Sequence, residues 1–293
     1  METLESLSDA LETTGDIQSI VRTMKALSAV SIRQYERAEE ALTEYERTID
    51  LGMAALLLDR RSAGLPTLLE RPVQRGREAL IAIGSDRGLC GRYNEVISRR
   101  AIDHISGTDT VLGVLGVRAA ARLEAAGHRA DKLFPTPGSV DGFNGVVQSV
   151  LVSIDAWMRD QRVDRVRLAH NRRDGWNTAR PVLRQLLPIP RDYVAELTTT
   201  SWPGRAIPFF RMDREALASW LIRERLFVLL YRALAEALAS EHATRLAAMQ
   251  NAERNVQERR EELDARFRQK RQETITRELL DVVAGYEAAQ TAS

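Results

Sequence analysis

The sequence predicts a mixed helical and α/β fold, with long helices at both ends of the chain and a compact α/β domain between them. The last fifty residues give the clearest signal, because the stretch from Ala243 to Ala288 contains no proline and only one glycine, Gly285. The first sixty residues also lack proline, and the middle of the chain alternates short apolar runs with helical stretches. These patterns predict an N-terminal helical part over residues 1–62, a central domain over 74–210 and a C-terminal helix over 211–293.

Composition restricts the class of protein. The 293 residues carry 44% hydrophobic and 5% aromatic side chains, which favours long helices over a β-sandwich. The formal net charge of +1 gives no overall field that would draw the chain to nucleic acid. No apolar run is long enough to span a bilayer, so we expect any membrane association to be indirect. The single cysteine, Cys90, excludes an internal disulfide.

The N-terminal segment from Thr3 to about Leu58 predicts one long helix. Its only glycines are Gly15 and Gly52, and fraying is expected at Gly15. Apolar residues recur at helical spacing, for example Val21, Met24 and Leu27.

The central segment predicts a largely parallel sheet, because apolar runs alternate with helical stretches. The predicted strands are Ala79–Ile83, Thr110–Val117, Val166–Ala169 and Tyr193–Leu197, and the predicted helices span 92–105, 118–126 and 146–159. Arg205–Phe210 is a candidate edge strand, because its proline excludes a central position.

The C-terminal segment predicts one helix from about Met212 to the end, about 110 Å long. Such a helix needs a partner, so we expect it to pair antiparallel with the N-terminal helix in an irregular coiled coil. That pairing would bring two groups of cations into one zone facing an acidic partner. The groups are Arg22, Lys25 and Arg33 on the first helix, and Arg266, Arg268, Lys270 and Arg271 on the second.

The loop Gly84–Gly91 follows a predicted strand and precedes a helix, where doubly wound folds bind phosphates. It lacks the Gly-Lys-Ser/Thr ending of a phosphate loop, so we interpret it as a tight turn with Asp86 as a capping residue. Cys90 has no histidine in a recognisable pairing motif, and no Cys or His spacing predicts a metal site. The segment His170–Asp174 ends a predicted strand, where sites occur in α/β sheets, but such segments are more often ordinary surface loops.

Three segments resemble the gamma subunit of F-type ATP synthases, the central rotor shaft. They are Asp16–Arg33, Ser85–Asn94 with the letters SDRGLCGRYN, and Ala248–Asn255 together with Ile275–Gly285. Departures at Thr23, at Arg92, where a second glycine is usual, and at Tyr286 indicate a divergent branch.

The resemblance implies a rotor with no catalytic site or cofactor and with a Rossmann-like central domain. It would turn inside a ring of alternating alpha and beta subunits, with epsilon and the membrane ring at its foot, on the cytoplasmic face of a bacterial inner membrane. The positions matched for contacts to the catalytic ring are Met24, Lys25, Arg271, Gln272, Thr276 and Asp281. The matched apolar tip, expected in a hydrophobic sleeve, is Leu279, Leu280, Val282 and Val283, and the matched structural loop contains Ser85, Asp86, Gly88, Cys90 and Gly91.

Two other functions stay open at this point. The first is a stand-alone α/β enzyme with a helical dimerisation arm, carrying Asp86 and Cys90 in its site. The second is a coiled-coil scaffold that belongs to no motor.

Overall fold

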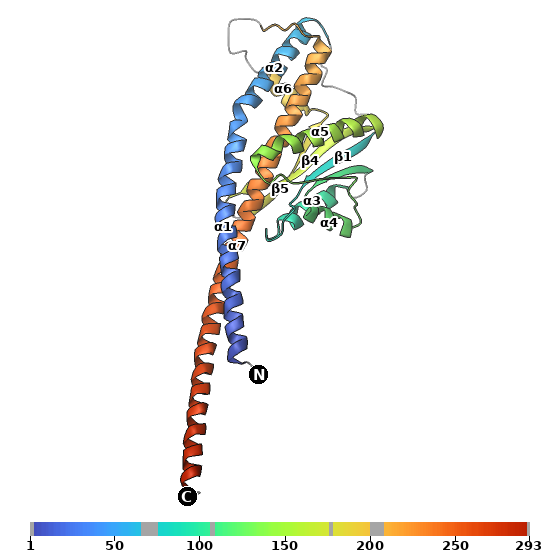
Figure 1. The fold of residues 1–293 in the computed structure, drawn as a ribbon. Helices are drawn as coiled ribbons and strands as arrows, with labels where there is room; N and C mark the ends of the chain where they lie inside the picture. The colour runs from blue at the N-terminus through green and yellow to red at the C-terminus, as the bar shows by residue number, and fades with distance from the viewer. Residues whose placement is uncertain (1–2, 66–75, 106–108, 176–177, 200–207, 292–293) are drawn as a thin grey trace. The chain divides into compact units, whose positions relative to one another are not determined.

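The computed structural model describes residues 3–65, 76–105, 109–175, 178–199 and 208–291 (Figure 1). The chain forms two compact units, Met1–Leu27 with Leu246–Ser293, and Ser28–Arg245. Two helices run through both units, α1 (Leu4–Ala41) and α7 (Arg214–Thr291). The predicted combination of long terminal helices with a central α/β domain is therefore confirmed.

The unit Ser28–Arg245 contains a five-stranded sheet in the order β3-β2-β1-β4-β5. Its strands are β1 (Arg77–Ile83), β2 (Thr110–Leu115), β3 (Lys132–Phe134), β4 (Val163–Asp174) and β5 (Thr178–Leu187). Strands β1 to β4 are parallel to one another, and β5 returns antiparallel to β4. Helices that connect parallel strands must lie on the faces of the sheet, and this explains why Ala79–Ile83 of β1 is buried and continuously apolar.

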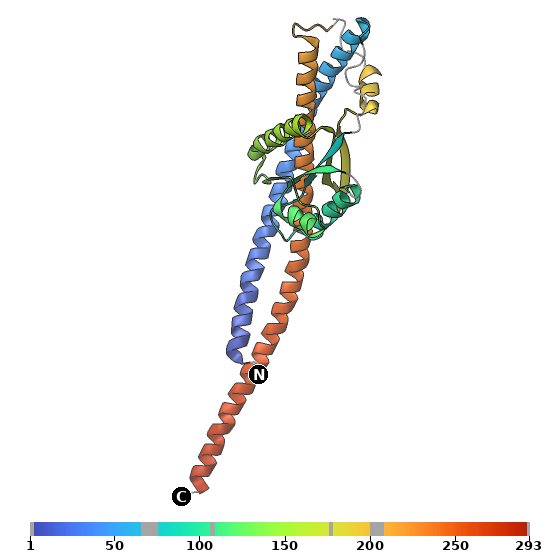
Figure 2. The same ribbon diagram turned by 90° about the vertical axis from the view of Figure 1, so that its right-hand side faces the viewer.

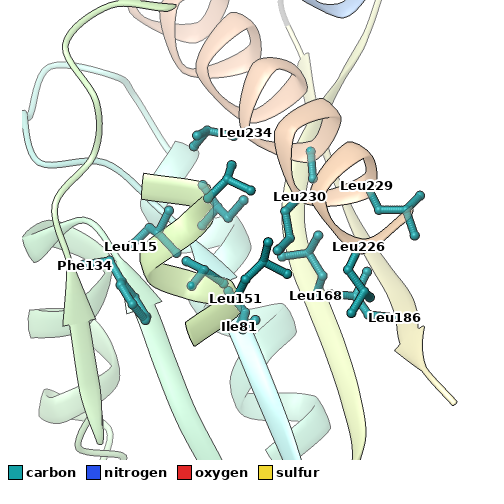
Figure 3. Close-up of a cluster of buried hydrophobic side chains, with 14 of the residues drawn as sticks. Ile81, Leu115, Phe134, Leu151, Leu168, Leu186, Leu226, Leu229, Leu230 and Leu234 are labelled. Atoms are coloured by element: carbon teal, nitrogen blue, oxygen red, sulfur yellow. The ribbon is translucent and has the colours of Figure 1, made fainter. Parts of the chain in front are cut away.

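Helices cover both faces of this sheet. On one face lie α3 (Tyr93–Ile105) and α4 (Val117–Ala125), which pack on Leu80 and Ala82 of β1. On the other face lie α5 (Phe143–Asp160) and the first part of α7. Figure 3 shows leucines of α7, among them Leu226 and Leu230, packed against Leu168 of β4. The alternation of side chains along each strand therefore builds two cores, and α7 is a wall of the larger one.

A third core joins α2 (Thr43–Ser62) to α6 (Arg191–Thr199) and the start of α7. Figure 2 shows α6 beside α2, with Leu197 and Met53 both buried in this cluster. Ion pairs cross from α2 to α7 in antiparallel order, because Arg60 meets Glu215 at 3.0 Å whereas Glu46 meets Arg232 at 2.6 Å.

In the unit Met1–Leu27 with Leu246–Ser293, α1 and α7 pair antiparallel. Lys25 lies opposite Glu253, and Gln18 lies opposite Gln257 and Arg260. Leu7, Thr14 and Val21 are buried at seven-residue spacing on α1, and Met249 and Leu263 are buried on α7. This is the seam of an irregular coiled coil, as the sequence predicts.

Several predicted elements were wrong in detail. The N-terminal segment forms two helices, α1 and α2, with a turn at Leu42, and Gly15 lies inside α1. Tyr193–Leu197 is part of helix α6, because Tyr193 and Leu197 are one helical turn apart and both pack in the third core. Strands β3 and β5 were not predicted. Half of the candidate strand Arg205–Phe210, positions 205–207, lies outside the described residues, and positions 208–210 are not in a strand.

Candidate functional site

The loop between β1 and α3 is held by its own polar side chains. The Asn94 amide nitrogen donates to Ser85 Oγ at 2.7 Å, and the Ser85 backbone nitrogen donates to Asn94 Oδ1 at 3.0 Å. The loop turns through Leu89 and Gly91, whose φ angles are 59° and 55°. Glycine suits such a position, whereas leucine adopts it only when its surroundings impose it. The loop therefore has one well-determined conformation.

Asp86 caps the start of α4. The capping prediction implied instead that it caps α3, the helix that follows its own loop. Its carboxylate accepts from the Val117 backbone nitrogen at 2.9 Å, and from both the nitrogen and the hydroxyl of Thr136. Burial would raise the pKa of Asp86, but these hydrogen bonds outweigh it and the pKa is lowered. Asp86 is thus an ionised structural acceptor that ties three connections together.

Cys90 is a buried structural thiol. It contacts Ser85 Oγ and the Arg87 carbonyl oxygen, both at 3.7 Å. Burial raises the pKa of the Cys90 thiol, which is the opposite of what a nucleophile requires. Asp86 and Cys90 therefore do not form the enzyme site of the stand-alone alternative. Among the described residues, no cluster of His, Cys, Asp and Glu side chains could hold a metal ion.

The same loop is attached to α7 by a buried ion pair. Arg245 is 4% exposed, pairs with Glu241 at 2.5 Å and donates to the Gly88 carbonyl oxygen at 3.3 Å. One turn earlier on α7, the Ala237 carbonyl oxygen accepts from the Tyr93 hydroxyl at 3.0 Å. The contacts of Glu241, Arg245 and Tyr93 could not be predicted from the sequence, because residue type alone does not reveal a buried partner. The arrangement fixes the α/β layers to the long helix.

The residues matched for contacts to a surrounding ring divide into two groups. Met24 is half-buried, and Lys25 donates to Glu253 at 2.5 Å, with Arg22 sharing the same carboxylate at 3.5 Å. Arg271, Gln272, Thr276 and Asp281 are exposed on α7.

The two groups of cations do not share a zone. The pairing of Lys25 with Glu253 sets the register, so Arg22 and Lys25 lie opposite a stretch well before Arg266. Arg266 instead pairs with Glu262 on its own helix. The predicted cationic collar was therefore wrong for the part of these helices in this unit.

The end of α7 continues past the N-terminus of α1 (Figure 1). Beyond Thr274, which is half-buried, the helix carries Ile275 and a group of further exposed apolar residues. The four positions matched as the tip, Leu279, Leu280, Val282 and Val283, are all in this group, with Leu279 at 61% and Val282 at 71% exposure. An exposed apolar surface of this kind on a single helix is a candidate contact surface. Within the described part of the chain, each helix is too short or too polar to form a membrane span.

A family model described as ATP synthase matches residues 3–289. A chain named ATP synthase gamma chain from Granulibacter bethesdensis is 28% identical over 303 residues, covering 98% of this chain and 100% of that one. A gamma chain of the same name from a Synechococcus species is 29% identical over 320 residues, covering 98% and 99%.

Solved structures share the fold. A chain of the Euglena gracilis mitochondrial ATP synthase, from the structure of OSCP, F1 and c-ring, superposes with a TM-score of 0.67 at 17% identity, covering 99% of this chain and 95% of that one. A chain from the central stalk and c-ring of the Tetrahymena thermophila mitochondrial enzyme gives a TM-score of 0.55 at 18% identity, covering 80% and 99%.

Proposed function

The chain belongs to the ATP synthase gamma family, and we propose that the end of its α7 helix turns inside the ring of alpha and beta subunits while its α/β unit binds epsilon and the membrane ring. As the central rotor stalk, the chain has no catalytic site of its own and acts by coupling rotation to the rest of the complex. The observation that carries the proposal is the uncovered apolar stretch of α7 after Thr274.

The apolar and polar residues of this stretch suit two different contacts. Leu279, Leu280, Val282 and Val283 would turn in an apolar sleeve, which can hold the helix without bonds specific to one angle. Arg271, Gln272, Thr276 and Asp281 would make polar contacts with the ring, as would Lys25 on α1, and Met24 would add a flexible apolar contact. Exposed ion pairs contribute only about 0–1 kcal/mol each, so such contacts can break at every step of a turn. As the helix turns, it would contact each site of the ring differently and so shift the populations of the ring's conformers.

Exposed apolar side chains in the unit Ser28–Arg245 support a contact at the foot. They lie on α2, on the start of α7 and just before α7, namely Leu58, Phe209, Met212 and Trp220, with Phe209 at 82% exposure. We assign this surface to epsilon or the membrane ring, and so place the chain peripherally on the cytoplasmic face of a bacterial inner membrane.

A reversible crosslink tests the proposal in the assembled complex. Asp281→Cys is introduced after Cys90→Ser, and its thiol is oxidised onto a cysteine placed in the facing beta subunit. We expect multi-site ATP turnover to stop on crosslinking and to return on reduction. Arg129→Cys, at an exposed position of the α/β unit, is the control and should give no crosslink to the same cysteine. Undiminished turnover with a complete crosslink would refute rotation of this stretch against the ring.

A further inference from the structure

An open cleft in the unit Ser28–Arg245 has no role in the fold or in the function described so far. Its volume is about 440 Å³, and β4, β5, α1 and α7 supply its walls. Its charged lining residues are Arg172, Arg173, Arg184, Arg232, Glu36, Glu39 and Glu236. Arg172 and Arg173 belong to the segment His170–Asp174, which lies wholly within β4 and has His170 and Asn171 fully buried, so the surface loop favoured for it by the sequence was wrong.

Most of these charges already have partners within the chain. Arg173 pairs with Glu36, and Arg232 pairs with Glu46 at 2.6 Å. Glu236 accepts from the fully buried His170 at 2.6 Å. Arg172 and Arg184 have no hydrogen-bond or ion-pair partner among the described residues, and both lie close enough to Glu236 to act on its carboxylate.

Within the part of the chain that the structure describes, Glu39 is the one lining carboxylate without a hydrogen-bond partner, so the acceptors left in the cleft are fewer than the donors. The two unpaired guanidinium groups are always charged and can only donate. Arg173 and Arg232 each add a buried Nε atom that has no hydrogen-bond partner. Arg172 is exposed and Arg184 is half-buried, so water reaches both, whereas the two Nε atoms are buried without acceptors, which is costly. An occupant that brings carboxylate oxygens would supply acceptors to these donors.

We propose that this cleft receives an acidic side chain from a segment of a neighbouring subunit, with Arg172 and Arg184 binding its carboxylate. The inference rests on the chain being a subunit of the rotary complex. A guanidinium fork matches a carboxylate in two parallel hydrogen bonds, which gives such a contact direction as well as strength.

The glutamates of the lining favour a protein segment over a free anion. Four arginines and three glutamates leave a net lining charge of only +1, which gives little long-range attraction for a dissolved phosphate. A side chain carried by a docked subunit needs no such attraction, because docking already supplies a high effective concentration.

A zero-length crosslink tests the contact in the assembled complex. The chain has only three lysines, Lys25, Lys132 and Lys270, so a new one gives a clean signal. Arg172→Lys and Arg184→Lys, each combined with Glu39→Gln to remove the one unpaired carboxylate of the lining, are treated with a carbodiimide. This reagent joins an amine to a carboxylate only when the two groups touch. Arg129→Lys, at an exposed position outside the cleft, is the matched control.

We expect peptide mass spectrometry to find an amide between position 172 or 184 and an Asp or Glu of another subunit, and none from position 129. The reversal Arg172→Glu with Arg184→Glu should weaken assembly about tenfold relative to Arg100→Glu with Arg129→Glu, as expected for two partly exposed charge pairs. A crosslink only to Glu36 or Glu236 of the same chain, or no crosslink at all, would overturn the proposal. So would protection of the new lysine by inorganic phosphate in the absence of any crosslink, which would mark a small-anion site. Each of these results leaves the Asp281→Cys experiment unaffected, so the two proposals can fail separately.

Discussion

Replacement of Arg245 tests whether the buried ion pair holds the α/β layers to α7. Arg245→Met keeps the length of the side chain but removes the charge that faces Glu241 and the donor that faces the Gly88 carbonyl. Both side chains of the pair are almost completely buried, at 5% and 6% exposure, so solvent screening does not reduce the effect.

The expected loss of unfolding free energy follows from the Glu241 carboxylate, which stays buried without its partner. An unpaired buried charge costs about 3–5 kcal/mol, and the lost donor to Gly88 adds about 1 kcal/mol. Removal of both charges, in Glu241→Leu with Arg245→Met, avoids the first of these costs. We therefore expect the double variant to be about 2–4 kcal/mol more stable than Arg245→Met alone.

The pH dependence gives a second readout. Burial already raises the pKa of Glu241 against the opposing effect of Arg245, and loss of Arg245 raises it further. A carboxyl whose folded pKa lies above its unfolded pKa favours folding below the unfolded value, and this contribution is lost as pH rises through the folded value. The penalty of Arg245→Met should therefore be largest at neutral pH and smaller under mildly acidic conditions, whereas the double variant should show no such trend.

Urea unfolding of the full chain measures these free energies, with circular dichroism for the helices and tryptophan fluorescence for the buried Trp157. A loss below about 1 kcal/mol in Arg245→Met, or equal losses in the single and double variants, would show that the pair is not a buried connection of the kind described.

Three further predictions concern a glycine packed against the loop, the half-buried His242 and the helix pair. Gly116→Ala should lower the free energy of unfolding by about 3 kcal/mol or more, because φ is 94° and the new Cβ would lie 2.6 Å from the Ser85 backbone. Gly127→Ala, where φ is 88° and the space is open, should lower it by about 1 kcal/mol in the same urea titration. Burial, together with the charges of Arg245 and Arg87, lowers the pKa of His242 to about 4. The unfolded chain therefore binds the extra proton, and stability should fall as pH drops from about 6.5 to 4. His242→Phe should remove about 3 kcal/mol of that fall, and identical pH profiles of the two proteins would refute the assignment. Met24→Lys should preserve ATP hydrolysis by the assembled complex but reduce ion pumping. Arg22 and Lys25 already pair with Glu253, so the new cation must pair with an acidic group outside the α1–α7 helix pair. Equal loss of both activities would contradict this.

The elements with strong local patterns could be predicted from the sequence. Most of β1 and β2 is buried on both faces, and residues 79–83 and 111–115 contain no charged or polar side chain, while α7 has no helix breaker over most of its length. Strand β5 lies at the edge of the sheet, and its Arg180, Pro181 and Arg184 interrupt the apolar pattern. Strand β3 has only three residues, which no periodicity can reveal.

The polar connections could not be predicted, because they depend on residues far apart in sequence. Arg245 meets Gly88 across 157 positions, and Gln18 meets Arg260 across 242. The cationic collar failed for the same reason, since the register of the two helices is set by individual pairs such as Lys25 with Glu253. The tip and ring residues were predicted from the resemblance to a known family. The structure adds that the side chains of the tip are exposed.

The two edges of the sheet bear on how many copies of the chain can assemble. Strand β3 offers only three residues for pairing, and β5 contains Pro181, which has no N–H to donate. Neither edge is a good template for a strand from a second copy. Edges of this kind disfavour association of two copies of the chain through this sheet.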